Sequence, residues 1–143
     1  MGAVGTSVSF VDENRGYYPL NSNGGNTVLE TLDGGLNWND TGKANAVMFI
    51  GSDAKGDNIV ASSLFGAVYS NDGGKNFYTS NTLTGGMGVR FSDSLVWMTS
   101  GNKYVMSSST GGWFWNSHYV TELQTTTRYI AAPSDKIVYV TAG

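Results

Sequence analysis

The stretch "YSNDGGKNFY", residues 69–78, places an acidic residue and two glycines between runs that alternate as strands do. The similar stretch "ETLDGGLNWN" begins 39 residues earlier, at 30–39, and "SSSTGGWFWN" begins 38 residues later, at 107–116. Each contains a Ser or Thr, two adjacent glycines and a closing aromatic residue. Self-similarity at a fixed period indicates a chain built from copies of one structural unit.

Around each of these turns the sequence predicts four short strands, here called strands A to D of a unit. The first unit reads SVSFVD, GYYPLN, NTVLETLD and NWND; the second reads AVMFIGS (46–52), NIVASS, GAVYSND and NFYTS; the third reads MGVRFSD, LVWMTSG, KYVMSSS and WFWNS. TRYIAAPSD and KIVYVTAG follow and match strands A and B of a fourth unit. No segment keeps a helical apolar pattern over three turns, so helices are expected to be nearly absent.

A period of about 40 residues with four strands per unit predicts a β-propeller. We therefore expect an all-β chain with about three and a half four-stranded antiparallel blades. The whole chain is predicted to be one partial propeller, with blades at about 6–40, 45–80 and 87–117 and a half blade at about 127–143. Four aromatic residues fall at one place in strand A and are predicted to pack between blades: Phe10, Phe49, Phe91 and Tyr129.

The composition excludes several classes of function. The chain has 143 residues and no cysteine, which excludes disulfides, thiolate catalysis and zinc-thiolate sites. A net charge of -3 without a basic cluster argues against a nucleic-acid partner. No window holds the 18 or more apolar residues that a membrane-spanning helix needs. We expect neither a nucleic-acid partner nor a membrane span.

The repeated turn has a physical explanation in which each residue stabilises the turn. An Asp at its head, Asp33 or Asp72, can accept backbone N–H groups two or three residues further on. The glycines supply positive φ, and the closing aromatic ring begins strand D and packs on the sheet. In the third copy Thr110 replaces the Asp, so that turn is predicted to be looser or differently bonded. The predicted structural residues are Thr31, Asp33, Gly35, Trp38, Ser70, Asp72, Gly74, Phe77, Ser108, Gly112 and Trp115.

The pattern Ser/Thr-x-Asp-x-Gly-x-x-Trp/Phe resembles the Asp-box, also called the BNR repeat, over nearly the whole chain. The layout of the first unit is most similar to the photosystem II assembly and stability factors, and "VYSNDGGKNF" is also similar to sortilin-type receptors. Xyloglucan-active glycoside hydrolases belong to the same family. The resemblance implies that the boxes lie on C–D turns away from the binding face. It also implies an extracytosolic location, whether secreted, periplasmic or lumenal.

No catalytic group of residues stands out. The sialidases of the resembled family need three converging arginines and a Phe/Tyr-Arg-Ile-Pro motif, and that motif is missing here. Glycosidases generally need two carboxylates across a cleft, and none of the strand-A turn acids forms an evident pair: Asp12, Asp93 and Asp135. One histidine without cysteine gives neither a zinc site nor a catalytic triad. We predict a protein that is not an enzyme and has no cofactor or metal.

Two arginines are candidates for ligand binding. Arg90 and Arg128 each precede a strand-A aromatic residue, so repeat geometry predicts that they lie side by side near the mouth of the channel. Two guanidinium groups there would suit a carboxylate or another anion. The alternative is that each arginine pairs with a local carboxylate or carbonyl.

Aromatic residues near the third turn are further candidates. Alternation along the strand predicts that at least one ring among residues 113–115 is exposed, where it could bind a sugar or a protein, or cover a neighbouring blade. His118 is interpreted as a loop residue, and Tyr119 lies in a predicted loop of the binding face. With the arginines, the candidate ligand-binding residues are Arg90, Arg128, Trp113, Trp115, His118 and Tyr119.

From these observations we predict a non-catalytic recognition or assembly scaffold that binds protein through the loop face of a propeller. One alternative is a carbohydrate-binding, lectin-like propeller or a part of a glycoside hydrolase. Another is a self-assembling structural unit. Three and a half blades leave exposed sheet faces at both ends, so the isolated chain is predicted not to be a monomer. Either the remainder of a propeller or further copies of the chain would cover those faces.

Overall fold

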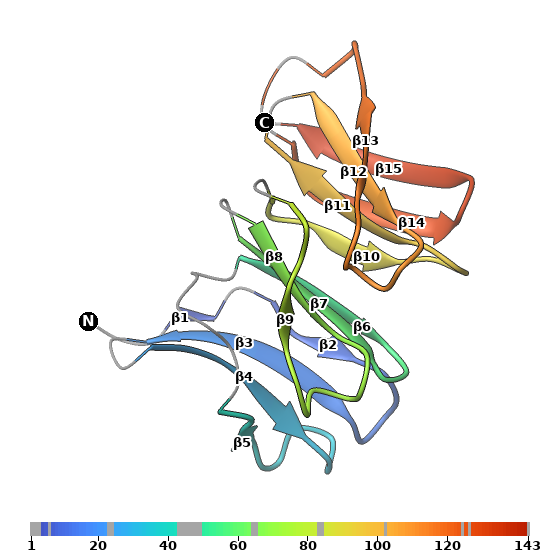
Figure 1. Ribbon diagram of the computed structural model, residues 1–143. Coiled ribbons are helices and arrows are strands. Elements are labelled where there is room, and N and C mark those ends of the chain that lie inside the picture. The colour runs from blue at the N-terminus through green and yellow to red at the C-terminus, as the bar shows by residue number, and fades with distance from the viewer. Residues whose placement is uncertain are drawn as a thin grey trace.

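The computed structural model describes residues 4–5, 7–22, 25–42, 50–63, 66–82, 85–101, 103–123, 125 and 127–142. These residues form an all-β, partial propeller in which four antiparallel sheets follow one another in chain order (Figure 1). No helix in the described part of the chain is long and apolar enough to cross a membrane.

Blade 1 is made of β1 (Val4–Gly5), β2 (Ser9–Phe10), β3 (Gly16–Ser22), β4 (Gly25–Thr31) and β5 (Asn39–Asp40). Both β1 and β2 pair with β3, so together they act as one broken strand A. Strands β3, β4 and β5 then pair in sequence order as strands B, C and D.

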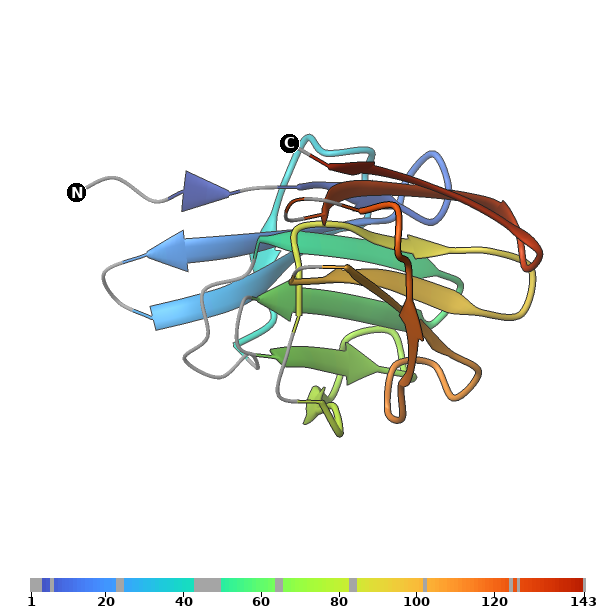
Figure 2. The ribbon, with the colours of Figure 1, turned by 90° about the horizontal axis from the view of Figure 1, so that it is seen from above.

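Blade 2 is made of β6 (Gly51–Lys55), β7 (Asn58–Ser63), β8 (Gly66–Ser70) and β9 (Tyr78–Thr79). Figure 2 shows these strands in that order from one side of the molecule to the other. Of the predicted strand A at 46–52, residues 46–49 lie outside the described residues, and the strand ends later than predicted, because β6 pairs from residue 51 through residue 55. A tight turn with positive φ at Gly56 joins β6 to β7, so the polar residues just before it belong to the strand.

Blade 3 is made of β10 (Val89–Phe91), β11 (Val96–Ser100), β12 (Tyr104–Ser108) and β13 (Asn116–Tyr119). The strands pair in sequence order. The chain then forms a two-stranded hairpin from β14 (Thr127–Ser134) and β15 (Ile137–Ala142), as expected for strands A and B of a half blade.

The strand-A aromatics do not form the predicted set of packing residues. The strand pairings place Phe10 opposite Gly16 and Phe91 opposite Val96, and the residue at that place in blade 2 is Ala54. Phe49 lies outside the described residues. Of the others, Phe91 is half-buried against the core, but Phe10 is 44% exposed and Tyr129 is 66% exposed. The prediction fails for these two because no further blade of the described chain lies against them.

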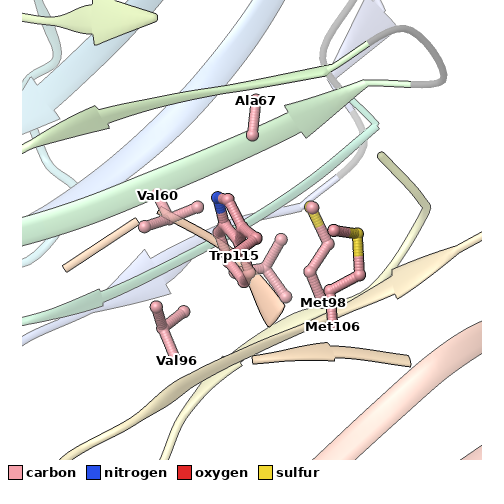
Figure 3. Packing of buried hydrophobic residues seen from close by; sticks show 7 residues of the cluster. Val60, Ala67, Val96, Met98, Met106 and Trp115 are labelled. Carbon is pink, nitrogen blue, oxygen red and sulfur yellow. The ribbon is translucent and has the colours of Figure 1, made fainter. Parts of the chain in front are cut away.

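Two apolar clusters hold consecutive blades together. Between blades 1 and 2 the buried residues are Tyr17, Val28, Ala54, Ile59, Ala61 and Val68. Between blades 2 and 3 they are Val60, Ala67, Val89, Val96, Met98, Met106 and Trp115. Figure 3 shows the Trp115 ring lying among Val60, Ala67 and Met98. The consecutive residues Ile59 and Val60 of β7 belong to different clusters, because successive side chains of a strand point to opposite faces.

Polar contacts between successive A–B turns reinforce this packing. Lys55 Nζ of blade 2 donates to the carbonyl oxygens of Ser92 and Asp93 in blade 3, at 2.5 and 2.6 Å. The Asp135 carboxylate of the hairpin accepts the Ser94 N–H at 2.9 Å. Hydrogen bonds from the Ser92 and Ser94 side chains, with those from the Ser94 and Leu95 N–H groups, hold the pKa of Asp135 well below its usual range. Among the predicted turn acids, Asp135 therefore stabilises a contact between blades through its carboxylate, whereas the carboxylate of Asp12 accepts N–H groups of its own turn.

Candidate functional site

The innermost strands of the partial propeller surround a cavity of about 340 Å³. It lies where β6, β10 and β14 meet, which is the channel side of the blades. Its lining combines backbone groups, two serines, an arginine and an aromatic ring: Ser7, Ile50, Gly51, Ser52, Met87, Gly88, Val89, Arg90, Tyr129 and Ile130. We call this cavity the channel cavity.

Arg90 is the cation of the channel cavity. Its side chain is exposed, and Nη1 donates to the Val89 carbonyl oxygen at 2.7 Å, which leaves other guanidinium N–H groups for a ligand. Asp53 lies near Arg90 and accepts the Phe91 N–H at 2.8 Å. Burial raises the pKa of Asp53, and the hydrogen bond from Phe91 and the charge of Arg90 act in the opposite direction.

Arg128 lies on the adjacent strand but does not line the channel cavity. A Cβ added to Gly88 would lie 3.1 Å from the Arg128 carbonyl oxygen, so Arg128 is level with Gly88 and Arg90 is two residues further along β10. Within the described part of the chain, the exposed Arg128 side chain makes no hydrogen bond or ion pair. The two arginines are on neighbouring strands, but only Arg90 faces the cavity.

The three repeated turns share one backbone conformation. Turn 1 is residues 31–38, turn 2 is 70–77 and turn 3 is 108–115. The paired glycines have φ of 71° and 93° at Gly34 and Gly35, and 71° and 83° at Gly73 and Gly74. In turn 3 the values are 68° and 102° at Gly111 and Gly112. These are left-handed values that side-chain-bearing residues resist, so the glycines are required by the turn.

Hydroxyl and carboxylate groups divide the hydrogen bonding of each turn. In turn 2 the Ser70 hydroxyl accepts the Gly74 N–H at 2.9 Å and donates to Asp72 at 2.9 Å. Asp72 in turn accepts the Asn76 N–H at 2.9 Å and its side-chain amide at 2.7 Å. Turn 1 repeats the pattern with Thr31, Asp33 and Asn37. The carboxylate accepts from the residue four positions on, rather than two or three as expected.

These hydrogen bonds keep the turn carboxylates ionised. The N–H groups of Asn76 lower the pKa of Asp72 to about 2, and those of Asn37 lower the pKa of Asp33. A carboxylate with a depressed pKa whose oxygens already accept hydrogen bonds is a poor general acid or base near neutral pH. The geometry thus gives both groups a structural use.

Turn 3 keeps the conformation without a carboxylate. The Thr110 hydroxyl accepts the Phe114 N–H at 2.9 Å, as a carboxylate oxygen does in the other turns, and Ser108 accepts the Gly112 N–H at 3.1 Å. Phe114 has no side-chain amide, so the second bond of the Asp72 type is absent. The turn is therefore differently bonded, as predicted, but its glycine angles show no loosening.

The closing aromatic residues lie just before strand D rather than within it. Trp38 Nε1 donates to the Gly35 carbonyl oxygen at 3.1 Å, and Trp115 Nε1 donates to that of Gly112 at 2.9 Å. Trp115 is only 5% exposed, so its predicted part in ligand binding is wrong: its ring belongs to the core between blades 2 and 3.

Trp113 and Phe114 are the exposed aromatic residues of turn 3. Their side chains are 54% and 45% exposed, and because they lie in the turn before β13 they do not follow the alternation of a strand, which would have placed Trp113 on the same side as the buried Trp115. The Asn81 N–H donates to the Trp113 carbonyl oxygen at 2.8 Å, and Asn81 forms a parallel bridge with Phe114. Blade 2 therefore anchors their backbone while both rings face solvent.

His118 and Tyr119 lie in strand β13, which corrects their interpretation as loop residues. His118 Nε2 is 2.7 Å from the Ser107 hydroxyl oxygen, and its ring centre is 5.6 Å from that of Trp97. Tyr119 packs edge-on against Tyr104 at 5.4 Å, and both rings are exposed. The sequence reading missed Tyr104, and the strand-C to strand-D pairing in blade 3 was the signal that could have found it.

Comparison with solved structures identifies similar propellers. YCF48 bound to D1 peptide aligns with a TM-score of 0.65 at 18% identity, over 92% of this chain and 47% of that chain. YCF48 from Cyanidioschyzon merolae aligns with the same TM-score and identity. The Niastella koreensis GH74 enzyme aligns with a TM-score of 0.71 at 13% identity, over 96% of this chain and 26% of that chain.

This chain therefore spans about half the length of the YCF48 chains and about a quarter of the GH74 enzyme. Neither the protein-family models nor the curated protein sequences give a match. At these identities the likeness extends to the fold alone, because one propeller scaffold carries many functions. The chain is a partial β-propeller similar to those of YCF48 and the GH74 enzymes.

Proposed function

We propose that residues 1–143 form a single partial propeller of the Asp-box type that acts as a non-catalytic scaffold for recognition of a protein partner. The Ser/Thr-x-Asp hydrogen bonding of turns 1 and 2 supports the Asp-box assignment. The fold shared with YCF48, which has been observed bound to a D1 peptide, supports a peptide partner. The carboxylates of the turns are structural in this proposal, and ligand binding belongs to the channel side.

The observation that carries the proposal is the exposed Arg90 beside Tyr129 in the channel cavity. A guanidinium group next to an aromatic ring suits the end of an extended peptide, where a carboxylate takes the N–H donors and an apolar side chain covers the ring. The hydroxyls of Ser7 and Ser52 are further polar groups of the same lining. Arg128, on the neighbouring strand, is proposed to contact the peptide outside the cavity.

Binding of the D1 peptide seen with YCF48 tests this proposal, measured by fluorescence anisotropy with a labelled peptide. Arg90→Ala is expected to raise Kd by about 10-fold or more, because it removes charge-assisted hydrogen bonds. Arg90→Lys should recover part of the loss, and Arg128→Ala should have the smaller effect. Lys136→Ala, which removes an exposed charge outside the cavity, is the matched control. Equal affinities of wild type and Arg90→Ala would contradict the proposal.

Carbohydrate binding is the second candidate, favoured by the exposed rings of Trp113 and Phe114 and by the fold shared with GH74 enzymes. Sugars commonly stack on exposed aromatic rings, and these two rings are rigidly placed by the backbone contacts to blade 2. Screening on a glycan array tests it. Binding that is lost in Trp113→Ala and kept in Tyr78→Ala, an exposed aromatic of blade 2, would favour this candidate over peptide recognition.

A further inference from the structure

The hairpin β14–β15 has one face buried and one face exposed. Ile130 faces blade 3, because a Cβ added to Gly88, the residue before β10, would meet its side chain at 2.9 Å. Residues that alternate with Ile130 and with its partner Val140 point away from blade 3. These exposed residues are mostly apolar and define the C-terminal face: Tyr129, Ala131, Ile137 and Tyr139, the last of which is 64% exposed.

Blade 1 also has one buried and one exposed face. Tyr17 and Val28 pack on blade 2, whereas the alternate residues of the same strands face outward. Two of them, Phe10 and Tyr18, place their rings 6.2 and 6.0 Å from that of Trp38. The outward residues define the N-terminal face: Val8, Phe10, Tyr18, Leu29 and Trp38.

The N-terminal face corresponds, position by position, to the face that blade 3 buries against blade 2. The pairings Phe10–Gly16 and Gly16–Thr31 in blade 1 match Phe91–Val96 and Val96–Ser108 in blade 3. Phe10 thus corresponds to Phe91, and the same register gives Tyr18 with Met98, Leu29 with Met106 and Trp38 with Trp115. Blade 1 therefore exposes a surface of the kind that blade 3 uses for packing.

The C-terminal face has the complementary character. Tyr17 of strand B faces blade 2, and Val60, at the same place in β7, faces blade 3. Tyr139 is in this place in the hairpin, since it pairs with Ala131 on the face turned away from blade 3. The N-terminal face thus corresponds to the blade 3 side of the interface that joins blades 2 and 3, and the C-terminal face corresponds to the strand A and strand B part of the blade 2 side.

The charges at the A–B turns agree with this match. Between blades 2 and 3, Lys55 crosses to the turn that begins at Ser92. On the C-terminal hairpin the exposed A–B turn cation is Lys136, and the A–B turn of blade 1 carries the exposed acids Asp12 and Glu13. Docking of the two faces would bring opposite charges together at the same edge of the interface.

We propose that two copies of the chain associate head to tail, with the C-terminal face of each copy on the N-terminal face of the other. This proposal goes beyond peptide binding and names the partner for the two exposed apolar faces, and Tyr129 lies where the C-terminal face meets the channel cavity. Two identical contacts related by a two-fold axis close a ring of two times four, or eight, sheets, which is within the size range of propellers. A closed pair covers both apolar faces, whereas one chain alone leaves both in water.

Cysteine cross-linking tests the arrangement cleanly, because the chain has no cysteine of its own. Phe10→Cys and Tyr139→Cys are prepared separately, mixed and oxidised, and covalent dimers are measured on a non-reducing gel. The mixture is expected to give a cross-linked heterodimer, and each variant alone should give little, because the faces meet head to tail. Ser109→Cys, at an exposed position of turn 3, is the control and should cross-link with neither.

Sedimentation velocity of the unmodified chain keeps the proposal testable if a cysteine variant fails to fold. A dimer at micromolar concentration that Tyr139→Asp converts to a folded monomer, with unchanged far-UV circular dichroism, is the expected result. A monomer at all concentrations would overturn the proposal and leave the faces to another partner. Cross-linking within either single variant, or a ladder of open oligomers, would overturn the closed head-to-tail pair.

Discussion

The two interfaces between complete blades use the same strands and turns but different chemistry. Between blades 1 and 2, Arg15 donates to Glu30 at 3.3 Å, to Asp57 at 3.1 Å and to the Gly73 carbonyl oxygen at 3.2 Å. The Tyr17 hydroxyl reaches the same carbonyl oxygen at 3.3 Å. The turn of blade 2 is therefore fixed to blade 1 by a polar anchor at the end of an apolar cluster.

Between blades 2 and 3 the described residues form no counterpart of the Arg15 anchor, although Lys55 and Asn81 make other polar contacts across this interface. The strand pairings match Ile59 of blade 2 with Gly16 of blade 1. Asn58 therefore lies at the place of Arg15, and Val60 at the place of Tyr17. A groove of about 690 Å³ remains at the turn end, lined by Asn58, Ser109 and Gly111 among others. The buried ring of Trp115 and the methionines supply the packing instead. The same repeat unit is thus joined to its neighbour mainly by an arginine anchor in one interface and mainly by buried apolar side chains in the other.

The largest expected effect comes from removing the apolar side chain that packs between blades 2 and 3. Trp115→Ala should lower the free energy of unfolding by about 3–5 kcal/mol, because it leaves a large cavity in the cluster between blades 2 and 3. Urea denaturation followed by far-UV circular dichroism measures this. Trp113→Ala, which removes the exposed neighbouring ring, is the control and should change stability by about 0.5 kcal/mol or less. Equal losses in the two variants would show that Trp115 does not join the blades.

A smaller loss is expected from removing the polar anchor. Arg15→Ala should destabilise the chain by about 1–2 kcal/mol, since Glu30 and the Gly73 carbonyl oxygen lose a half-buried donor. Arg128→Ala is the matched control and should be near neutral, because that side chain makes no polar contact with the described residues. The same denaturation experiment distinguishes them, and equal stability of the two variants is the contradicting result.

The carboxylate of turn 2 predicts a dependence of stability on pH. The pKa of Asp72 is lowered to about 2 in the folded chain, below its ordinary value of 3.8, so its contribution is present above pH 3.8. That contribution is lost as the pH falls from about 4 toward 2. Asp72→Asn should lower Tm at pH 7, and its difference from wild type should shrink over that window. Glu13→Gln is the control; a difference independent of pH would contradict the role of the carboxylate.

The smallest expected effect tests whether one interface can adopt the chemistry of the other. Asn58→Arg places a guanidinium beside Gly111 in the groove, at the place where Arg15 reaches Gly73 in the other interface. We expect a stabilisation of about 0.5–1 kcal/mol, in the range typical of a new surface hydrogen bond. Asn58→Lys, with charge but no planar fork, should gain less. A loss of stability in Asn58→Arg would show that the two interfaces are not equivalent at this position.

The repeat made the fold predictable. Glycine pairs at constant spacing predicted the turns, and the alternating runs around them predicted all of the sheets, because both signals depend on local backbone requirements. The failure at strand A of blade 2 has a physical cause. Asp53 and Lys55, which the predicted strand left out, are polar residues of an innermost strand that bond across to blade 3, so hydrophobic pattern alone could not find them.

Less of the candidate site followed from the sequence. Arg90 lines the channel cavity, but its position relative to Arg128 depends on the irregular register of β14, which local sequence does not encode. At least one ring among residues 113–115 is exposed, as expected, but strand alternation would have put Trp113 and Trp115 on the same side, and only Trp115 is buried, against Val60 of the neighbouring blade. A site that forms between two repeats can be located only when the geometry of both repeats is known.

The most direct test of peptide recognition on the channel side is a nitrogen-15 NMR titration of the chain with the D1 peptide. The predicted result is that amide signals of the channel cavity shift, led by Ser52, Arg90 and Ile130. Signals of the turn glycines, such as Gly34 and Gly73, should stay in place because the turns are structural. Shifts confined to the turns or to Trp113, with the Arg90 amide unchanged, would contradict the proposed function.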